Sequence, residues 1–300
     1  MNVVETARIV NVIKMMKKIN KGVFFMNIGD IKFQEAIKLI LDEGIFEEGD
    51  VRAHWEDGMP APTKFCTQYV ETYDISKNEF PITTVKPTFI KNFINEIFWI
   101  YQDQTSDLDI LRNKYGIKYW DSWESKDMPG TIGMRYGAVV KKYDQINKLI
   151  NGLKNDPLNR RHRIDLNQIE CIEATDGLHS CAYSTLWTVR GEFLDCTLLQ
   201  RSNDVVGAYN ANNIQYVALQ MMIAHTVGLK PGKFTRFVQN IHIYNRHIDV
   251  AKEYLSRKPS DKQPKLIFKP KSNNFYEYSI NDFEIIDYEP QPRIKFELAI

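Results

Sequence analysis

Apolar residues recur at the spacing of an α-helix in three long stretches of the chain. The first, FQEAIKLILDEGIFEEGD (33–50), predicts a helix that stops near Gly44. The second, PTFIKNFINEIFWIYQDQ (87–104), predicts a strongly apolar helix. The third, NNIQYVALQMMIAHTVGLKPG (212–232), predicts a long buried helix that ends before Gly228, a residue suited to a C-cap.

Alternation of apolar and polar residues predicts strands elsewhere. TKFCTQYVETYDI (63–75) alternates throughout, and AYSTLWTVRGEFLDCTLLQRS (182–202) predicts two strands joined by a short turn at Arg190-Gly191. Three late pieces, KLIFKP, FEIIDYEP and RIKFELAI, are also strand-like. There is no regular βαβ rhythm, no G-x-G-x-x-G motif and no P-loop. The pattern therefore predicts an α+β fold, with helices packed on a mainly antiparallel or mixed sheet.

Composition narrows the class of protein. The chain has 300 residues, 43% of them hydrophobic, and no repeat or Gly/Ser-rich linker divides it, so we expect one continuous domain. The net charge of +1 gives no reason to expect nucleic acid or an anionic membrane as a partner. Four cysteines without a C-x-x-C pair predict neither a zinc site nor a disulfide framework, and favour a cytoplasmic protein without a metal.

The first residues read as an addition to this domain. Glu5, Arg8 and Lys14 interrupt the N-terminal apolar stretch, which excludes a signal peptide, and no apolar run reaches the length of a membrane span. Apolar residues at helical spacing predict a surface helix there. We expect residues 1–45 to form a helical extension whose role the sequence does not reveal.

Several residues are candidates for catalysis or ligand binding, and each also has an ordinary structural interpretation. Cys181 precedes a strand and could be a nucleophile, although a lone cysteine is commonly a small buried hydrophobe. Arg201 and Asn212 lie in a polar stretch before the third helix, where arginine could bind an anion and an amide could cap the helix or bind a base edge. Glu96 lies in the apolar FINEIFWI, so it is exposed, paired, or kept with a raised pKa for proton transfer.

Other candidates are similarly ambiguous. Arg160 and Arg161 belong to a charge run that is either solvated or a phosphate clamp. His242 and Tyr244 alternate onto one strand face, which suits hydrogen bonds to hydroxyl groups and lacks a third ligand for a metal. Aromatic residues in YWDSWE and MRYGAVV could stack on a flat ligand or fill the core.

Taken in order, these segments resemble the folate-dependent, cysteine-using thymidylate synthase family. The resemblance runs from about Val51 to Ile300 and rests on YWDSW, RYG, NRRHR, the segment around Cys181, QRSNDV, MIAHTVGLKPG, HIYNRHI and the terminal FELAI. It implies a mixed sheet with packed helices, a catalytic domain over residues 46–300 and a homodimer formed through the sheet. The implied reaction methylates dUMP at C5, with 5,10-methylenetetrahydrofolate as co-substrate.

The resemblance also implies catalytic roles. Cys181 is expected to add to C6 of the uracil ring, with Arg201 beside it binding phosphate and favouring the thiolate. Asn212 is expected to bind the O4 and N3 edge of the base. Glu96 is expected to organise water for proton transfer, and Tyr136 to act in proton abstraction.

Binding roles follow from the same resemblance. The nucleotide ligands implied are Arg52, Arg201 and Ser202 for the phosphate, Arg160 and Arg161 for the phosphate in the neighbouring subunit, and His242 and Tyr244 for the 3′-hydroxyl. The folate ligands implied are Asp204 for the pterin, Trp120 beside the site, Lys86 near the glutamate tail, and Ile300 at a terminus that folds over the folate and excludes water. Asp204 is also expected to be catalytic.

The sequence departs from the family pattern near the base. Ser180 and Ala182 replace the usual proline before the cysteine and the frequent histidine after it, and GAYNAN (207–212) keeps only the final asparagine of its motif. Such features also occur in the sister pyrimidine-deoxynucleotide hydroxymethylases, which add water in place of hydride. Asn212 predicts uracil rather than cytosine, and the terminal LAI favours methylation. A non-catalytic nucleotide- or RNA-binding module is a further alternative, although such a binder needs no nucleophile.

Overall fold

The computed structural model describes residues 26–299 of the chain. Six strands form one mixed sheet in the spatial order β1-β2-β6-β5-β4-β3, in which only the β5–β6 pair is parallel. The six are β1 (Ile45–Phe46), β2 (Thr63–Asp74), β3 (Arg163–Asp165), β4 (Ala182–Arg190), β5 (Phe193–Asp204) and β6 (Lys230–Tyr244). A separate antiparallel pair consists of β7 (Lys265–Phe268) and β8 (Phe283–Ile286).

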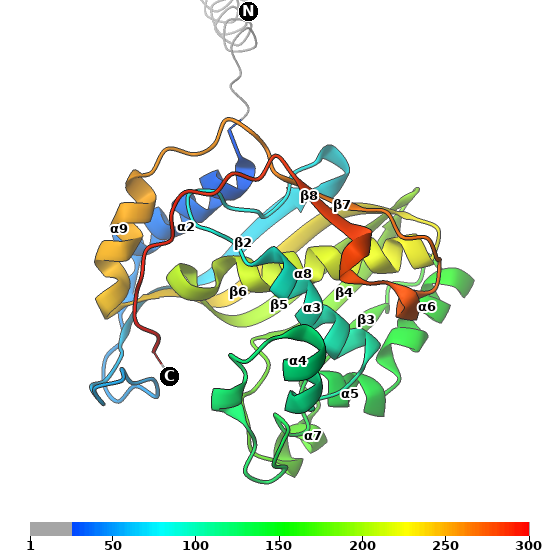
Figure 1. The fold of residues 1–300 in the computed structure, drawn as a ribbon, viewed down its shortest axis with the longest axis horizontal. Helices are drawn as coiled ribbons and strands as arrows, with labels where there is room; N and C mark the ends of the chain where they lie inside the picture. Colours follow the sequence, from blue (N-terminus) through cyan, green and yellow to red (C-terminus); the bar gives the residue numbers. More distant parts are fainter. Residues whose placement is uncertain (1–25, 300) are drawn as a thin grey trace, which may run out of the picture.

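Eight α-helices of the described residues surround these sheets (Figure 1). They are α2 (Ile28–Glu43), α3 (Ile90–Ile97), α4 (Leu108–Tyr115), α5 (Gly137–Lys142), α6 (Gln145–Asn155), α7 (Ile169–Ala174), α8 (Val205–Thr226) and α9 (Ile248–Ser256). Figure 1 shows α8 lying across one face of the large sheet, with α3 crossing in front of it. The predicted α+β class, a mixed sheet with packed helices, is confirmed.

The predicted hairpin forms as β4 and β5. Its turn contains Gly191 with φ of +61°, a left-handed conformation that glycine adopts without steric cost. After β5 the chain passes through α8 and returns as β6 parallel to β5, so α8 begins at the end of the hairpin that carries Arg201. The antiparallel pairing of β4 with β5 places the end of β5 against the segment that precedes β4.

Helix α8 is buried on almost every side, which requires partners for its polar side chains. It begins at Val205, seven residues earlier than predicted, so the asparagines lie inside its first turns. Asp204 caps it instead, accepting a hydrogen bond from the Val206 N–H at 3.0 Å. The buried amides bond to neighbouring elements: Asn210 to Pro81 O, Asn213 to Glu71, and Gln220 to Leu194 O and Lys233 O.

The predicted apolar helix after Pro87 forms as α3 and continues into one π-helical turn, Phe98–Gln102. Glu96 lies in its last turn and is 5% exposed, so it is not a surface residue. The two helices α3 and α8 pack together, and Glu96 lies near Gln215 in the middle of α8.

Part of the predicted N-terminal extension belongs to the main fold. Helix α2 packs against β2, α8 and α9, and its Phe33, Ile37 and Ile40 have no exposed surface. The surface helix predicted near the N-terminus lies outside the described residues.

The last predicted strand, RIKFELAI, was wrong for the described residues 293–299, which have no regular structure. Side chains rather than a neighbouring strand bond to this part of the backbone. Arg257 donates to Pro292 O, and the His247 ring to Glu297 O, both at 2.7 Å. The two other late strands, β7 and β8, are as predicted.

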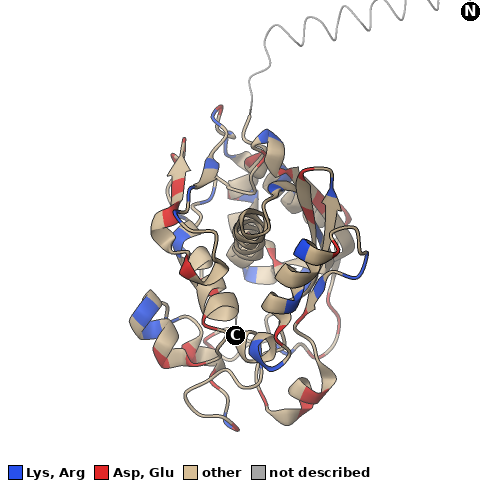
Figure 2. Cartoon of the chain, turned by 90° about the vertical axis from the view of Figure 1, so that its right-hand side faces the viewer, with Lys and Arg blue, Asp and Glu red and all other residues tan. Residues whose placement is uncertain are grey.

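The surface in Figure 2 carries charges of both signs. Acidic and basic residues are interspersed in the view of Figure 2 rather than gathered by sign. Among residues 26–299, no helix combines the length and apolar character needed to cross a membrane. The four cysteines form no disulfide.

Candidate active site

Cys181 lies immediately before β4, two residues after His179, which lines an open cleft. Its carbonyl accepts a hydrogen bond from the Arg201 N–H at 2.8 Å, so the cysteine is fixed to the neighbouring strand β5. The cleft has a volume of about 560 Å³ and is lined by Arg52, Trp123, Glu124, Gly177, Leu178, His179 and Arg201. Two arginines that the sequence predicted as anion ligands therefore meet beside the predicted nucleophile.

Burial and charge oppose each other at the Cys181 thiol. Burial raises its pKa, and the positive charges of Arg201 and Arg52 lower it by smaller amounts. The Arg201 guanidinium donates from Nη2 to His179 O at 2.9 Å, whereas its buried Nε has no partner among the described residues. A guanidinium group that lines the cleft and retains an unpaired donor is suited to an anionic ligand.

Tyr136 is hydrogen-bonded to the backbone of Cys181. Its hydroxyl oxygen accepts a hydrogen bond from the Cys181 N–H at 3.4 Å, and its ring centroid lies 5.1 Å from that of Trp120. Burial raises the pKa of the Tyr136 hydroxyl well above its ordinary value, so the group is neutral and can donate a proton or a hydrogen bond. Tyr136 also has φ of +45°, an uncommon value for a residue with a side chain.

The buried Glu96 carboxyl accepts a hydrogen bond from another side chain. The Tyr119 hydroxyl donates a hydrogen bond to it. Burial raises the pKa of Glu96, and hydrogen bonding by Tyr119, Gln215 and Trp120 partly opposes this shift. The sequence analysis considered Tyr119 only as a possible stacking residue, because a contact between segments 23 positions apart leaves no local signal.

The side-chain amide of Asn212 lies between two buried glutamines. Its Oδ1 accepts from Gln200 Nε2 at 2.9 Å, and its Nδ2 donates to Gln215 Oε1 at 2.7 Å. Neither glutamine was among the predicted site residues. The spacing of Asn212 and Gln215 was a usable signal, since residues i and i+3 of a helix lie on the same face.

His242 and Tyr244 lie side by side at the end of β6, with ring centroids 5.2 Å apart. The Nδ1 atom of His242 is 2.9 Å from Asn240 Oδ1. Burial lowers the pKa of His242, so its ring is neutral at physiological pH, and burial raises the pKa of Tyr244 to about 12. The pair presents uncharged hydrogen-bonding groups, as the alternation predicted. Ser202 lies half-buried on β5.

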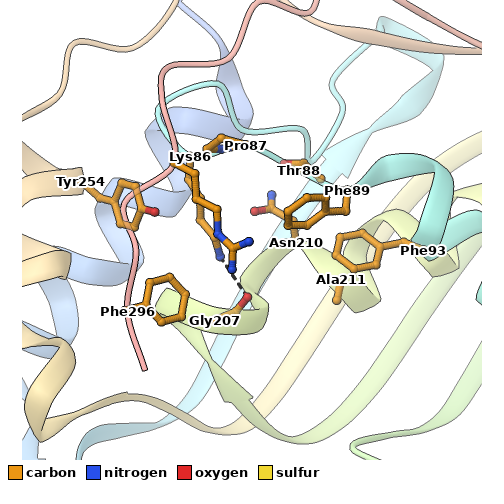
Figure 3. A pocket seen from close by; sticks show the side chains of 11 residues that line it. Lys86, Pro87, Thr88, Phe89, Phe93, Gly207, Asn210, Ala211, Tyr254 and Phe296 are labelled. Atoms are coloured by element: carbon orange, nitrogen blue, oxygen red, sulfur yellow. Dashed lines mark hydrogen bonds between the residues drawn. The ribbon is translucent and has the colours of Figure 1, made fainter. Parts of the chain in front are cut away.

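A second, smaller pocket of about 40 Å³ lies beyond the start of α8 (Figure 3). Lys86 enters it with 8% exposure and donates to Gly207 O at 3.2 Å. Burial lowers the pKa of Lys86 to about 8, although the nearby Asp204 acts in the opposite direction. Phe89, Phe93 and Phe296 line the same pocket, which therefore combines apolar rings with a cation.

Three predicted residues lie apart from these groups. Arg160 and Arg161 are exposed in the turn between α6 and β3 and do not line the cleft of this chain. Ile300 lies outside the described residues. Within residues 26–299 no cluster of three His, Cys, Asp or Glu side chains could hold a metal ion.

Comparison with known proteins gives consistent results. A family model described as thymidylate synthase matches residues 2–300. The thymidylate synthase of Lactococcus lactis subsp. lactis is 50% identical over 282 residues, which cover 92% of this chain and 100% of that protein. One from Streptococcus pneumoniae is 49% identical with the same coverage. The solved structure of thermostable thymidylate synthase A from Bacillus subtilis superposes with a TM-score of 0.85 at 34% identity, covering 90% of this chain and 99% of that one.

Proposed function

Because the chain belongs to the thymidylate synthase family, we propose that it methylates dUMP at C5 to give dTMP, with 5,10-methylenetetrahydrofolate as co-substrate. The observation that carries this proposal in the structure is that Arg201 and Arg52, which line one cleft, both act on the Cys181 thiol through their charges. The full-length match to relatives named thymidylate synthase favours methylation over the hydroxymethylase alternative.

Cys181 acts as the nucleophile. Its thiolate forms a bond to C6 of the uracil ring, and the electron pair of the C5–C6 double bond moves toward C5 and O4. The positive charges of the two arginines attract the phosphate and thereby position the nucleotide. The same charges stabilise the negative thiolate. An N–H of Asn212 directed at O4 stabilises the negative charge that develops there.

The nucleotide is held at three points. Arg52, Arg201 and Ser202 bind the phosphate, and the partnerless Nε of Arg201 supports this role. His242 and Tyr244 bind the 3′-hydroxyl, a role supported by their neutral, adjacent polar atoms. Asn212 binds the base edge.

The folate would lie along the start of α8. Asp204 and Trp120 flank the pterin, Lys86 binds the anionic glutamate tail, and Ile300 closes over the site. The surroundings of Lys86 support the contact with the tail, because they place a buried cation beside aromatic rings (Figure 3). When bound, the folate supplies both the one-carbon unit and the hydride. Glu96 and Tyr136 move protons near C5, as their raised pKa values allow.

The active unit is a homodimer whose sites are shared. Arg160 and Arg161 are exposed and do not line the cleft of their own chain, which suits ligands that reach the phosphate of the neighbouring subunit. The face of the sheet away from α8 carries exposed apolar side chains, with Val70 57% and Leu186 45% exposed. A second copy packed on this face would bury them. Four unpaired cysteines suit a cytoplasmic location.

Product identification tests the function. The purified protein with dUMP and methylenetetrahydrofolate should yield dTMP and dihydrofolate by mass spectrometry, whereas 5-hydroxymethyl-dUMP and tetrahydrofolate would indicate the alternative reaction. Cys181→Ser should abolish turnover and retain dUMP binding. Cys66→Ser, a second half-buried thiol on β2, is the matched control and should keep full activity. Turnover by the Cys181 variant would contradict the nucleophile assignment and favour a different chemistry.

A further inference from the structure

Tyr119 reaches the buried Glu96 carboxyl from the surface of the protein. Tyr119 is 43% exposed, whereas Glu96, near the end of α3, is 5% exposed. The Tyr119 hydroxyl donates a hydrogen bond to Oε2 of Glu96. A single side chain therefore links the protein surface to the carboxyl that is proposed to move protons near C5.

Hydrogen-bonding groups, and not a neighbouring cation, stabilise the charge of Glu96. Among the described residues, three groups offset the effect of burial on its pKa: Tyr119, Gln215 and Trp120. All three are uncharged, and Tyr119 has the largest effect. The Tyr119 hydroxyl is consequently the main group that favours the ionised form of this carboxyl.

The titratable groups that face Glu96 are tyrosine hydroxyls. They are Tyr119, Tyr136 at the start of α5 and Tyr216 on α8. Burial raises the pKa of each well above the ordinary value, and the charge of Glu96 adds to each shift. All three therefore keep their protons at physiological pH. Within this group, Glu96 is the side chain whose charge changes with pH.

A carboxyl must be ionised before it can accept a proton. Burial favours its protonated form, and a hydrogen bond to the charged form opposes this effect. Because Tyr119 keeps its proton, its hydroxyl remains a donor to Glu96 at physiological pH. We propose that Tyr119 is a positioning residue that holds Glu96 oriented and ionised, and so sets the lowest pH at which the enzyme remains active. This inference rests on the proposed role of Glu96 in proton transfer.

The first experiment titrates Glu96 directly, without substrates. Infrared difference spectroscopy of the full-length protein follows the carboxyl band that is lost in Glu96→Gln. In Tyr119→Phe, the pH midpoint of this band should rise by about one unit. Tyr115→Phe is the matched control, because it removes another half-buried hydroxyl that donates to a carboxylate, that of Asp103 at 2.8 Å. The control should leave the midpoint unchanged. Tyr119→Leu replaces the phenylalanine variant if the latter does not fold.

The second experiment measures kcat at saturating dUMP and methylenetetrahydrofolate as a function of pH. The acidic limb of the profile should move upward in Tyr119→Phe by the same amount as the infrared midpoint. At the pH where the unmodified enzyme has half its maximal kcat, the variant should be about fivefold slower, and the difference should vanish at higher pH. The KM for dUMP should not change, and Tyr115→Phe should match the unmodified enzyme throughout.

The outcomes separate this inference from the proposed function. An unshifted infrared midpoint in Tyr119→Phe overturns the inference, whatever the activity. A shifted midpoint with an unshifted kcat profile, or a loss of kcat by the same factor at every pH, shows that Tyr119 does not act on catalysis through the charge of Glu96. If the unmodified protein forms no dTMP, the proposed function fails, while the infrared titration still reports whether the hydroxyl controls Glu96.

Discussion

Glu71 on β2 and Arg236 on β6 form an ion pair that solvent does not reach, with side chains 2% and 0% exposed. The Glu71 carboxylate also accepts hydrogen bonds from Asn213 and from the hydroxyl groups of Tyr209 and Tyr73. The arginine in turn donates to Tyr209 O at 3.1 Å. The pair therefore joins the two strands to the first turns of α8.

Removing one member of this pair should be far more damaging than removing both. Arg236→Met leaves a carboxylate in the interior without its countercharge, and we expect the free energy of unfolding to fall by about 3–5 kcal/mol. The double variant Glu71→Leu/Arg236→Met should recover part of this loss. Urea denaturation followed by circular dichroism measures both. Arg190→Met, which breaks an exposed pair with Asp195, should cost no more than about 1 kcal/mol and serves as the control.

The reactivity of Cys181 should depend on Arg201. Because the guanidinium charge lowers the pKa of the thiol, Arg201→Gln should move the pH midpoint of Cys181 alkylation upward. Iodoacetamide labelling from pH 6 to 10, with peptide mass spectrometry, measures the rate at this cysteine. Arg190→Gln, at the opposite end of the same hairpin, should leave the midpoint unchanged. An unshifted midpoint in Arg201→Gln would contradict electrostatic activation of the thiol.

Glu96 should lower stability as pH rises. Burial raises its pKa in the folded state above the ordinary value of 4.5. Between these two values the folded protein binds more protons than the unfolded chain, so the free energy of unfolding falls with increasing pH. Glu96→Gln removes this titration. The melting temperature of Glu96→Gln minus that of the unmodified protein should therefore increase as the pH rises above 4.5. Below pH 4.5 this difference should be constant. A difference independent of pH would show that Glu96 titrates normally.

Lys86 should limit folate binding at alkaline pH. Its pKa is lowered to about 8, so above this pH it loses the charge that attracts carboxylates. We expect kcat/KM for methylenetetrahydrofolate to decline above pH 8, while Lys86→Arg keeps its charge and declines less. Measuring kcat/KM for dUMP over the same range corrects for other ionisations. Identical profiles for lysine and arginine would exclude Lys86 as the titrating group.

The fold was largely predictable because its signals are local. The Arg190-Gly191 turn and the apolar periodicity of α3 mark elements that depend on nearby residues. The strand predicted at 293–300 was wrong because alternation cannot reveal whether a partner strand exists. Here side chains bond to single carbonyls of the segment and of the residue before it, His247 to Glu297 O and Arg257 to Pro292 O.

The site was predictable only in part. Cys181 and Arg201 were identified because they occupy an ordered series of motifs. Gln200 and Gln215 were missed, because their importance lies in contacts with Asn212 across two elements. The shared role of Arg160 and Arg161 depends on a second chain and remains a prediction.

The many bonded amides of α8 have a mechanical consequence. Sliding this helix by one residue would turn it by about 100° and separate Asn210, Asn212, Asn213 and Gln220 together from their partners on other elements. At about 1–3 kcal/mol for each buried group left unsatisfied, four such losses approach the entire free energy that keeps a domain folded. The helix consequently has a single position on the sheet, and Asn212, which we propose to bind the base, is held in place before any nucleotide arrives.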